Sequence, residues 1–223
     1  MATALAGRGM TLAIHYRESQ VGAEALRREI EARGGTAACF AADLADAEAA
    51  RALPGRVVEQ FGRLDVLVNS AAVMRHVSFD DTSVALYDEV LDLNLRSVFF
   101  CTQGAAAALR ASRGKVINMA DLGGLEPWPG YAAHSVSKAG VVMLTKVLAL
   151  SLAPDVTVNA IAPGAVLVPE SYDEAERERL AATTPSRRLG SPDDVVTALL
   201  YLLEGGDYVT GEVLSVDGGR RLR

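Results

Sequence analysis

Two kinds of segment alternate regularly along this amino-acid sequence. Short apolar runs, rich in β-branched residues, are Met10–Tyr16, Thr36–Ala41, Leu64–Asn69, Val116–Met119, Val156–Ile161 and Glu212–Val216. The amphipathic stretches between them are Gln20–Arg33, Ala45–Gly62, Ser83–Ala111, Ala132–Leu152 and Pro192–Leu203. Near-continuous apolarity in short runs indicates strands that are covered on both faces. The alternation therefore predicts an α/β fold, a three-layer doubly wound parallel sheet, in a single domain over residues 1–223.

Composition limits the partners and the location that we expect. The chain has 223 residues, enough for one α/β core, with 22 basic and 28 acidic side chains and a net charge of −6. This balance favours neither a nucleic-acid partner nor an anionic membrane, and no metal site is expected. No apolar run approaches the roughly 20 residues that span a bilayer. Cys39 and Cys101 lie far apart in apolar surroundings, which predicts buried free thiols and a cytoplasmic location.

One irregular region interrupts the rhythm. After Pro163-Gly164 the chain runs through a lid-like insertion, about 165–188, before the alternation resumes. Glu174–Ala182 within it reads as a short, highly charged helix. A long excursion at the ligand-binding edge of a sheet is a candidate substrate lid, and a surface insertion without function is the alternative.

Several motifs agree in order and spacing with one protein family. They are Leu64–Ala72, Asn94 within LDLNLRSVFF, Val116–Lys138, Pro163-Gly164 after VTVNAIA, Tyr208–Gly211 and Val216–Gly219. Together they cover nearly the whole chain, and the chain resembles the short-chain dehydrogenase/reductase family. That resemblance implies a Rossmann-type fold, hydride transfer with a nicotinamide cofactor and a small-molecule substrate. It also implies a homotetramer or homodimer, paired through Ser83–Ala111 and Ala132–Leu152.

The resemblance places the catalytic residues on one stretch of sequence. In the family a polar residue is followed after thirteen positions by a tyrosine and four positions later by a lysine. Here these positions hold Asp121, His134 and Lys138, and Asn94 matches the asparagine that bends the fourth helix and supports proton supply. An imidazole titrates near neutrality and could act as the general acid. The imidazole nitrogen also extends less far from the backbone than a phenol oxygen does. A strongly reduced rate of catalysis is therefore the alternative.

Details favour the pteridine reductase-like branch of the family. That branch carries aspartate at the Asp121 position within an Asn-Met-x-Asp context, His-Tyr after the second strand, and a Gly-Tyr-x-x-Tyr segment that Gly130–His134 matches except at its end. A carboxylate can accept paired hydrogen bonds from an amino-pyrimidine-type ring. The alternative is that aspartate merely replaced the usual serine in a protein that is no longer selected for catalysis. The expected function is NADPH-dependent reduction of a carbonyl- or pterin-like molecule, and the alternatives are a catalytically silent relative or an inactive truncated product.

Cofactor preference depends on the end of the second family strand. Arg17 suits a 2′-phosphate, which favours NADP(H) over NAD(H), whereas Glu18 points the other way. The residues expected to bind cofactor are Tyr16, Arg17, Ser19, Asp43, Leu44, Asn69, Ser70, Ala71, Lys138, Pro163, Gly164 and Val166. Met74, Arg75 and His76 are candidates for facing the substrate, although His76 is more typical of a structural histidine.

The largest departure from the family is an absence within the sequence. Members begin with a strand and a glycine-rich turn whose amides bind the pyrophosphate. Gly7-Arg8-Gly9 has the wrong spacing, and MATALAGRGM reads as the tail of the first helix. We therefore expect an N-terminal truncation of roughly twenty residues. In the strand order 3-2-1-4-5-6 the absent strand is central, so we expect an apolar cleft through the core.

Overall fold

The computed structural model describes residues 1–168 and 172–222. Its strands are β1 (Leu12–Tyr16), β2 (Ala37–Ala41), β3 (Val66–Asn69), β4 (Lys115–Met119), β5 (Thr157–Pro163) and β6 (Val213–Val216). Each strand overlaps the apolar run that predicted it, with ends that differ by at most two residues.

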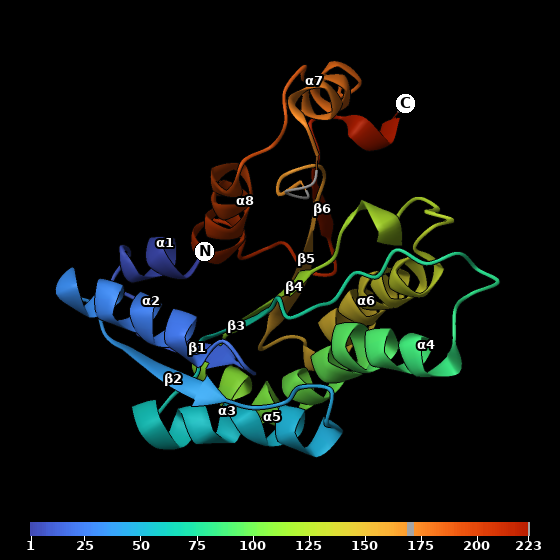
Figure 1. Ribbon diagram of the computed structural model, residues 1–223. Coiled ribbons are helices and arrows are strands. Elements are labelled where there is room, and N and C mark those ends of the chain that lie inside the picture. The colour runs from blue at the N-terminus through green and yellow to red at the C-terminus, as the bar shows by residue number, and fades with distance from the viewer. Residues whose placement is uncertain (169–171, 223) are drawn as a thin grey trace.

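The helices agree with the amphipathic pattern in the same way (Figure 1). They are α1 (Ala2–Ala6), α2 (Gln20–Ala32), α3 (Ala47–Phe61), α4 (Val84–Leu91), α5 (Ser97–Ser112), α6 (Ala132–Leu152), α7 (Glu174–Ala182) and α8 (Pro192–Glu204). Two short 3₁₀ turns cover Leu122–Gly124 and Arg220–Leu222. The stretch predicted as one helix, Ser83–Ala111, is divided by a π-helical turn at Asp92–Arg96. Asn94 lies in this turn, so the bend expected at that residue is present.

The strands form two separate sheets. One contains β1 and β2, and the other runs in the order β3-β4-β5-β6. Every pairing between these strands is parallel, for example Leu12 with Ala37 and Val66 with Lys115. The doubly wound α/β architecture is therefore confirmed, but the sheet is interrupted between β1 and β3, where the sequence predicted a cleft.

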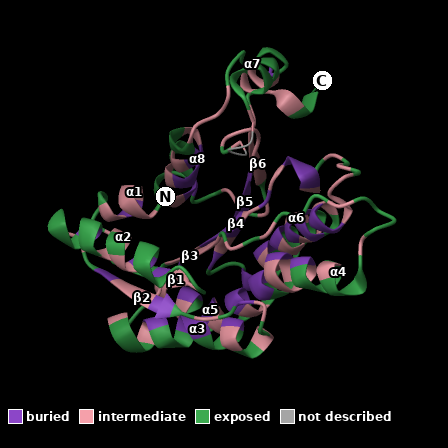
Figure 2. Ribbon diagram, in the orientation of Figure 1, coloured by how far each residue is buried: buried purple, intermediate pink, exposed green. Residues whose placement is uncertain are grey.

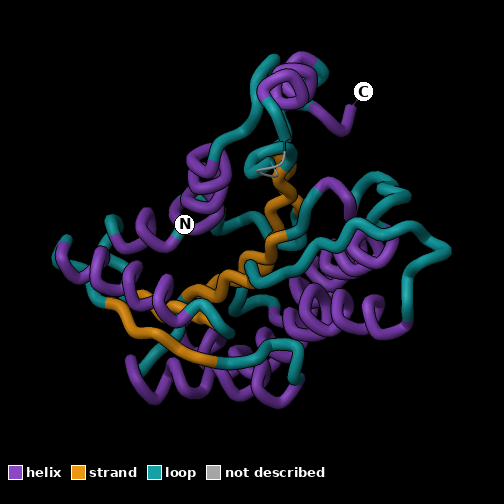
Figure 3. Tube along the Cα trace, in the orientation of Figure 1, coloured by secondary structure: helices purple, strands orange, loops and turns teal. Residues whose placement is uncertain are grey.

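Helices cover both faces of the sheets (Figures 1 and 3). On one face, α1 and α2 contact β1, and α8 contacts β5 and β6. On the other face, α5 lies against β3 and β4, α6 against β4 and β5, and α3 packs on α5. The buried residues concentrate between these layers (Figure 2), with β4 and β5 among the most buried strands. The carboxyl ends of β3, β4 and β5 thus meet at one edge, where functional residues are expected.

Helix α6 combines two properties. By length and composition it is the one helix in the described chain that could cross a membrane. It also contacts β5 and carries buried polar side chains, among them Ser137, Lys138 and Thr145. Such side chains facing a sheet are typical of a core helix in a doubly wound fold.

Two further expectations concern the lid and the cysteines. The charged helix α7 has the predicted bounds and no buried residue, whereas residues 169–171 of the lid-like insertion lie outside the described residues. The action of the insertion as a substrate lid stays a prediction. Both cysteines are free; Cys101 is buried and burial raises the pKa of its thiol to about 11, whereas Cys39 is half-buried.

Candidate active site

The segment from β4 to α6 brings the predicted catalytic residues together. Asp121 lies two residues beyond the end of β4, and the first two turns of α6 carry His134 and Lys138. The Lys138 side chain is buried, and its Nζ donates a hydrogen bond of 2.7 Å to the Met119 carbonyl. Burial lowers the pKa of Lys138, and the negative charge of Asp121 opposes that shift. The lysine is therefore anchored at the carboxyl end of β4.

His134 has close neighbours at both ring nitrogens. Its Nε2 lies 2.5 Å from Asp121 Oδ2, and its Nδ1 lies 3.2 Å from the Val73 carbonyl and 3.4 Å from Asn94 Nδ2. The two hydrogens on Asn94 Nδ2 have nearer acceptors, so Nδ1–H donates to the carbonyl of Val73. The ring is only 3% exposed. Neither nitrogen is left for a substrate oxygen in this arrangement.

Asn94 ties the π-helical turn to the loop after β3. Its Oδ1 accepts from the Val73 amide at 2.8 Å, and its Nδ2 donates to the Val73 carbonyl at 2.9 Å and to Ser137 Oγ at 3.1 Å. A π-turn of this kind is frequent at functional sites because it redirects side chains within a helix. In this chain Asn94 is a positioning residue that fixes Val73 beside His134.

Within the described chain, only one of the two carboxylate oxygens of Asp121 takes part in a hydrogen bond. Its Oδ2 is engaged with His134, while its buried Oδ1 has no hydrogen-bond partner among the described residues. Paired recognition of an amino-pyrimidine ring needs both oxygens, so this arrangement offers only half of the expected contact.

Sequence reasoning missed Trp128, whose indole ring stacks on the imidazole ring of His134. The two rings are stacked, with centroids 6.4 Å apart and planes 10° from parallel. Tyr131, the N-cap residue of α6, meets the same indole edge-on at 6.1 Å. An aromatic residue in the loop between Asp121 and the helix was the only available signal. The stack holds the imidazole in its buried position.

A connected set of hydrogen bonds joins polar side chains of β3, β4, α5 and α6 in the core. Asn69 Nδ2 donates to Asn118 Oδ1 at 2.8 Å and to Thr102 Oγ1 at 3.1 Å, and Asn118 Nδ2 donates to Thr145 Oγ1 at 2.9 Å. Asn118, Thr102 and Thr145 are buried. The predicted cofactor residue Asn69 therefore also links β3 to β4 and α5.

The predicted adenosine end of the cofactor site lies after β1. Arg17 is half-exposed and pairs with Glu18 at 2.8 Å. Ser19 is the N-cap residue of α2, and within the described chain its side chain makes no capping hydrogen bond. Tyr16 ends β1. This region offers the Ser19 hydroxyl, the Arg17 guanidinium and the N-terminus of α2, whose first turn has no acidic residue. These groups suit a phosphate.

The remaining predicted cofactor residues lie at the same edge with mixed orientations. Asp43 Oδ1 accepts from the Ala45 amide at 3.0 Å, and the Leu44 side chain is buried in the core beside Phe40. Ser70 and Ala71 follow β3 and line the cleft between the two sheets.

The turn after β5 is shaped by a close approach of the chain. A Cβ on Gly164 would lie 2.8 Å from Asp217 Cα, so a side chain there would force β6 away. Val166 N–H donates to the Gly164 carbonyl at 2.9 Å, which tightens the turn that Pro163 begins. The Gly164 amide also donates to the Val216 carbonyl at 3.0 Å, so the backbone of this turn is held against β6 at the carboxyl end of β5.

The three residues after β3 that were candidates for facing substrate differ from one another. Met74 is exposed, and Arg75 pairs with Glu89 at 2.7 Å. The His76 ring packs edge-on against Tyr131 with centroids 4.9 Å apart. His76 is thus in contact with the entry of α6, which agrees with a structural role.

Comparisons with known proteins identify the family. The family model described as Enoyl-(Acyl carrier protein) reductase matches residues 1–221. The chain belongs to the short-chain dehydrogenase/reductase family. A 3-oxoacyl-[acyl-carrier-protein] reductase of Synechocystis sp. is 35% identical over 222 residues, which is 98% of this chain and 90% of the relative. The 3beta-hydroxysteroid dehydrogenase 1 of Eggerthella lenta is 38% identical over 230 residues, covering 100% and 88%. The crystal structure of acetoin dehydrogenase YohF from Salmonella typhimurium has a TM-score of 0.87 at 30% identity, covering 99% of this chain and 90% of that one.

Family membership makes the chain a short-chain oxidoreductase that depends on a nicotinamide cofactor, and the described residues fit that cofactor in part. Lys138 and the Pro163-Gly164 turn suit its nicotinamide end, and Arg17 with Ser19 suits its adenosine end. A glycine-rich turn between a strand and a helix, which would hold the pyrophosphate in a short-chain reductase, is not present within residues 1–223. The two ends of the cofactor therefore fit this chain, and its middle does not.

Proposed function

We propose that this oxidoreductase reduces a carbonyl group of a small molecule and uses NADPH in preference to NADH. The observation that carries the proposal is the convergence of Asp121, His134 and Lys138 at the carboxyl end of β4. In this family the cofactor supplies a hydride, and the side chains of the protein supply the accompanying proton. The relatives named for 3-oxoacyl, steroid and acetoin substrates all act on keto or hydroxyl groups.

Each residue has a separate role in this proposal. Lys138 places a positive charge beside the substrate site, because its ammonium is fixed to the Met119 carbonyl. Asp121 and His134 hold a proton between Oδ2 and Nε2 at 2.5 Å. Asn94 fixes the loop that carries Val73. Release of either contact of His134 would be needed before the imidazole could donate a proton to a substrate oxygen.

A carbonyl substrate is favoured over a pterin-like one by the contact at Asp121. Engagement of Oδ2 with His134 removes one of the two acceptors that an amino-pyrimidine ring requires. A pterin-like substrate remains the second possibility within the same reaction class, supported by the motif around Asn118 and by the unpartnered Oδ1.

The competing function is a catalytically silent family member that binds cofactor or a partner. The burial of His134 and the engagement of both ring nitrogens support it. Steady-state NADPH oxidation separates the two functions. We expect slow turnover at millimolar NADPH with a diketone, a 3-oxo ester or a 3-oxosteroid, and loss of that turnover in Lys138→Met. The silent binder would be favoured if the parent chain oxidised NADPH no faster than Lys138→Met with every carbonyl substrate and with dihydropterin.

Arg17 is expected to set the preference for the 2′-phosphate. Arg17→Asp should weaken binding of 2′,5′-ADP by about tenfold or more, because a guanidinium contact to phosphate is replaced by repulsion. Binding of 5′-AMP should change little. Calorimetry with these two nucleotides tests the adenosine end alone, and Glu18→Gln is the matched control. Equal affinities for 2′,5′-ADP in the parent chain and in Arg17→Asp would show that Arg17 only forms a surface pair with Glu18.

The proposed homo-oligomer would use an exposed apolar stripe on α6. Val136, Met143, Val147 and Leu150 are exposed at helical spacing on this helix, and Phe99 is exposed on α5. Apolar side chains gathered on one face of a helix are typical of a subunit interface. The helices are those through which the family pairs its subunits.

A charge in that stripe should dissociate the oligomer. We expect Met143→Glu to lower the mass measured by light scattering to that of a smaller species, because a carboxylate would be buried without a partner. The control is Val21→Glu, at an exposed apolar residue of α2. Unchanged masses for both variants, or a monomeric parent chain, would contradict the assignment.

A further inference from the structure

His134 is held by two loops that are tied to each other. The loop after β3 places the Val73 carbonyl 3.2 Å from Nδ1, and the loop after β4 stacks the Trp128 indole on the ring at a centroid distance of 6.4 Å. Further along both loops, Val77 N–H donates to the Gly130 carbonyl at 3.0 Å, within a short parallel bridge. This bridge fixes the loops against each other, so the groups that hold the imidazole keep their relative positions.

The indole of Trp128 has little space in which to move. A Cβ on Gly123 would lie 2.9 Å from Trp128 Cε3, so the backbone of the 3₁₀ turn lies against the ring. Tyr131 packs edge-on against the indole at 6.1 Å, and the indole Nε1–H donates to Glu126 Oε1 at 3.0 Å. The orientation of the ring is thus set by packing and by a hydrogen bond to Glu126.

Glu126 supplies the directional part of this restraint. An indole has a single hydrogen-bond donor, and an acceptor at a fixed place selects one orientation of its plane. The backbone of Glu126 is itself held, because its N–H donates to the Leu122 carbonyl at 2.8 Å. With the carboxylate in this place, the plane of the Trp128 ring lies 10° from that of His134. The glutamate therefore acts on the imidazole through the indole.

In this orientation both imidazole nitrogens are engaged with protein atoms. Nε2 of His134 lies 2.5 Å from Asp121 Oδ2, and Nδ1 lies beside the Val73 carbonyl. Turning the ring toward a substrate oxygen would break these contacts and would also move it out of the stack with Trp128. A stacked aromatic pair has an attraction of its own, so the indole opposes that movement.

We propose that Glu126 is a positioning residue for His134 that acts through Trp128. By orienting the indole it keeps the imidazole against Asp121 and Val73, and this restraint opens before the imidazole delivers a proton. The effect on turnover rests on the proposed carbonyl reduction, whereas the effect on the position of the ring does not.

Exchange of the His134 ring proton with solvent measures the position of the imidazole without any turnover. The ring N–H resonance is observed by ¹⁵N-edited NMR in protein with labelled histidines, and its absence from His134→Phe assigns it. Glu126→Ala removes the acceptor of the indole N–H. Glu126→Gln is the matched control, because its amide oxygen can still accept that hydrogen bond. The amide of Ile117, buried in the centre of β4, is the reference for exchange through general unfolding.

The expected result is a local release of the ring. The His134 ring proton should exchange roughly tenfold faster in Glu126→Ala than in the parent chain, and at the parent rate in Glu126→Gln. Trp128→Leu should exchange at least as fast as Glu126→Ala, and the double variant should match Trp128→Leu, because both changes act through one indole. Unchanged exchange in Glu126→Ala, additive effects in the double variant, or an acceleration shared by Ile117 would overturn the proposal.

Turnover gives a second readout. With a 3-oxo ester, kcat for NADPH oxidation should rise about threefold in Glu126→Ala while KM changes little, because the imidazole is released more easily in every bound complex. Glu126→Gln should restore the parent value. A lower kcat in Glu126→Ala would show that the indole supports the productive geometry, and it would overturn the restraint. If no variant oxidises NADPH, the proposed reaction fails, and the exchange rates alone decide whether Glu126 positions His134.

Discussion

Replacing His134 with tyrosine is expected to raise carbonyl reduction by about 10²-fold, the usual contribution of a well-placed general acid. The imidazole is engaged with Asp121 at one nitrogen and with Val73 at the other. A phenol at the same position reaches further from the backbone and lies one helical turn from Lys138. Burial lowers the pKa of Lys138, and its nearby ammonium would stabilise the phenolate that forms when the phenol gives up its proton.

The comparison is made in this chain at millimolar NADPH, with initial rates of NADPH oxidation on one 3-oxo ester. His134→Phe is the matched control, because it keeps the aromatic volume against Trp128 without a hydroxyl. An unchanged rate in His134→Tyr together with a rate lost in His134→Ala would identify histidine as the true acid.

Residues 1–223 alone are expected to bind NADPH only in the millimolar range, or not measurably. The pyrophosphate in this family is held by the amides of a glycine-rich turn, which residues 1–223 do not contain. A marginal fold should accompany the weak binding, because the cleft leaves the apolar walls of two sheets without a partner strand. Each side chain of a buried strand contributes about 1.5–3 kcal/mol, which is large against the roughly 5–15 kcal/mol of a whole domain.

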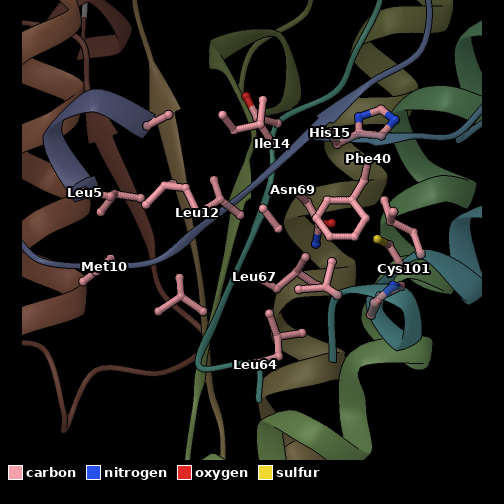
Figure 4. Close-up of a pocket in the computed structure, with 18 of the residues that line it drawn as sticks. Leu5, Met10, Leu12, Ile14, His15, Phe40, Leu64, Leu67, Asn69 and Cys101 are labelled. Atoms are coloured by element: carbon pink, nitrogen blue, oxygen red, sulfur yellow. The ribbon is translucent and has the colours of Figure 1, made fainter. Parts of the chain in front are cut away.

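Calorimetry and a thermal melt of residues 1–223 test these two expectations together. The control ligand is 2′,5′-ADP, which contains no pyrophosphate and should still bind at the adenosine end. Micromolar NADPH binding and a sharp thermal transition would contradict the expectation and would show that the cleft between β1 and β3 (Figure 4) closes by another route.

The sequence predicted most of the fold because its signals are local. The bounds of α6 and α7 agree residue for residue with the predicted ranges, and α8 begins at the predicted Pro192. The cleft was also predicted, from strand order. The register of the strands, for example Leu12 with Ala37 and Val66 with Lys115, depends on tertiary pairing that no local pattern determines.

The candidate site was predicted in part. Spacing placed Asp121, His134 and Lys138 together, and the structure brings them together at the carboxyl end of β4. The state of His134 was left open because it depends on Val73 and Trp128, which approach from separate loops. Tertiary packing of this kind decides whether a side chain faces substrate, and sequence spacing does not encode it. The roles of the individual site residues stay predictions.

Transfer of deuterium from NADPH labelled at C4 to a carbonyl substrate would show directly whether this protein catalyses hydride transfer. A single turnover suffices, so even a strongly attenuated enzyme can be detected. The protein is incubated with millimolar [4-²H]NADPH, labelled on either face in separate samples, and with a 3-oxo ester. We expect one deuterium on the carbinol carbon of the product by mass spectrometry, from one face only, and none in Lys138→Met. Unlabelled substrate recovered from both the parent chain and His134→Tyr would contradict this expectation.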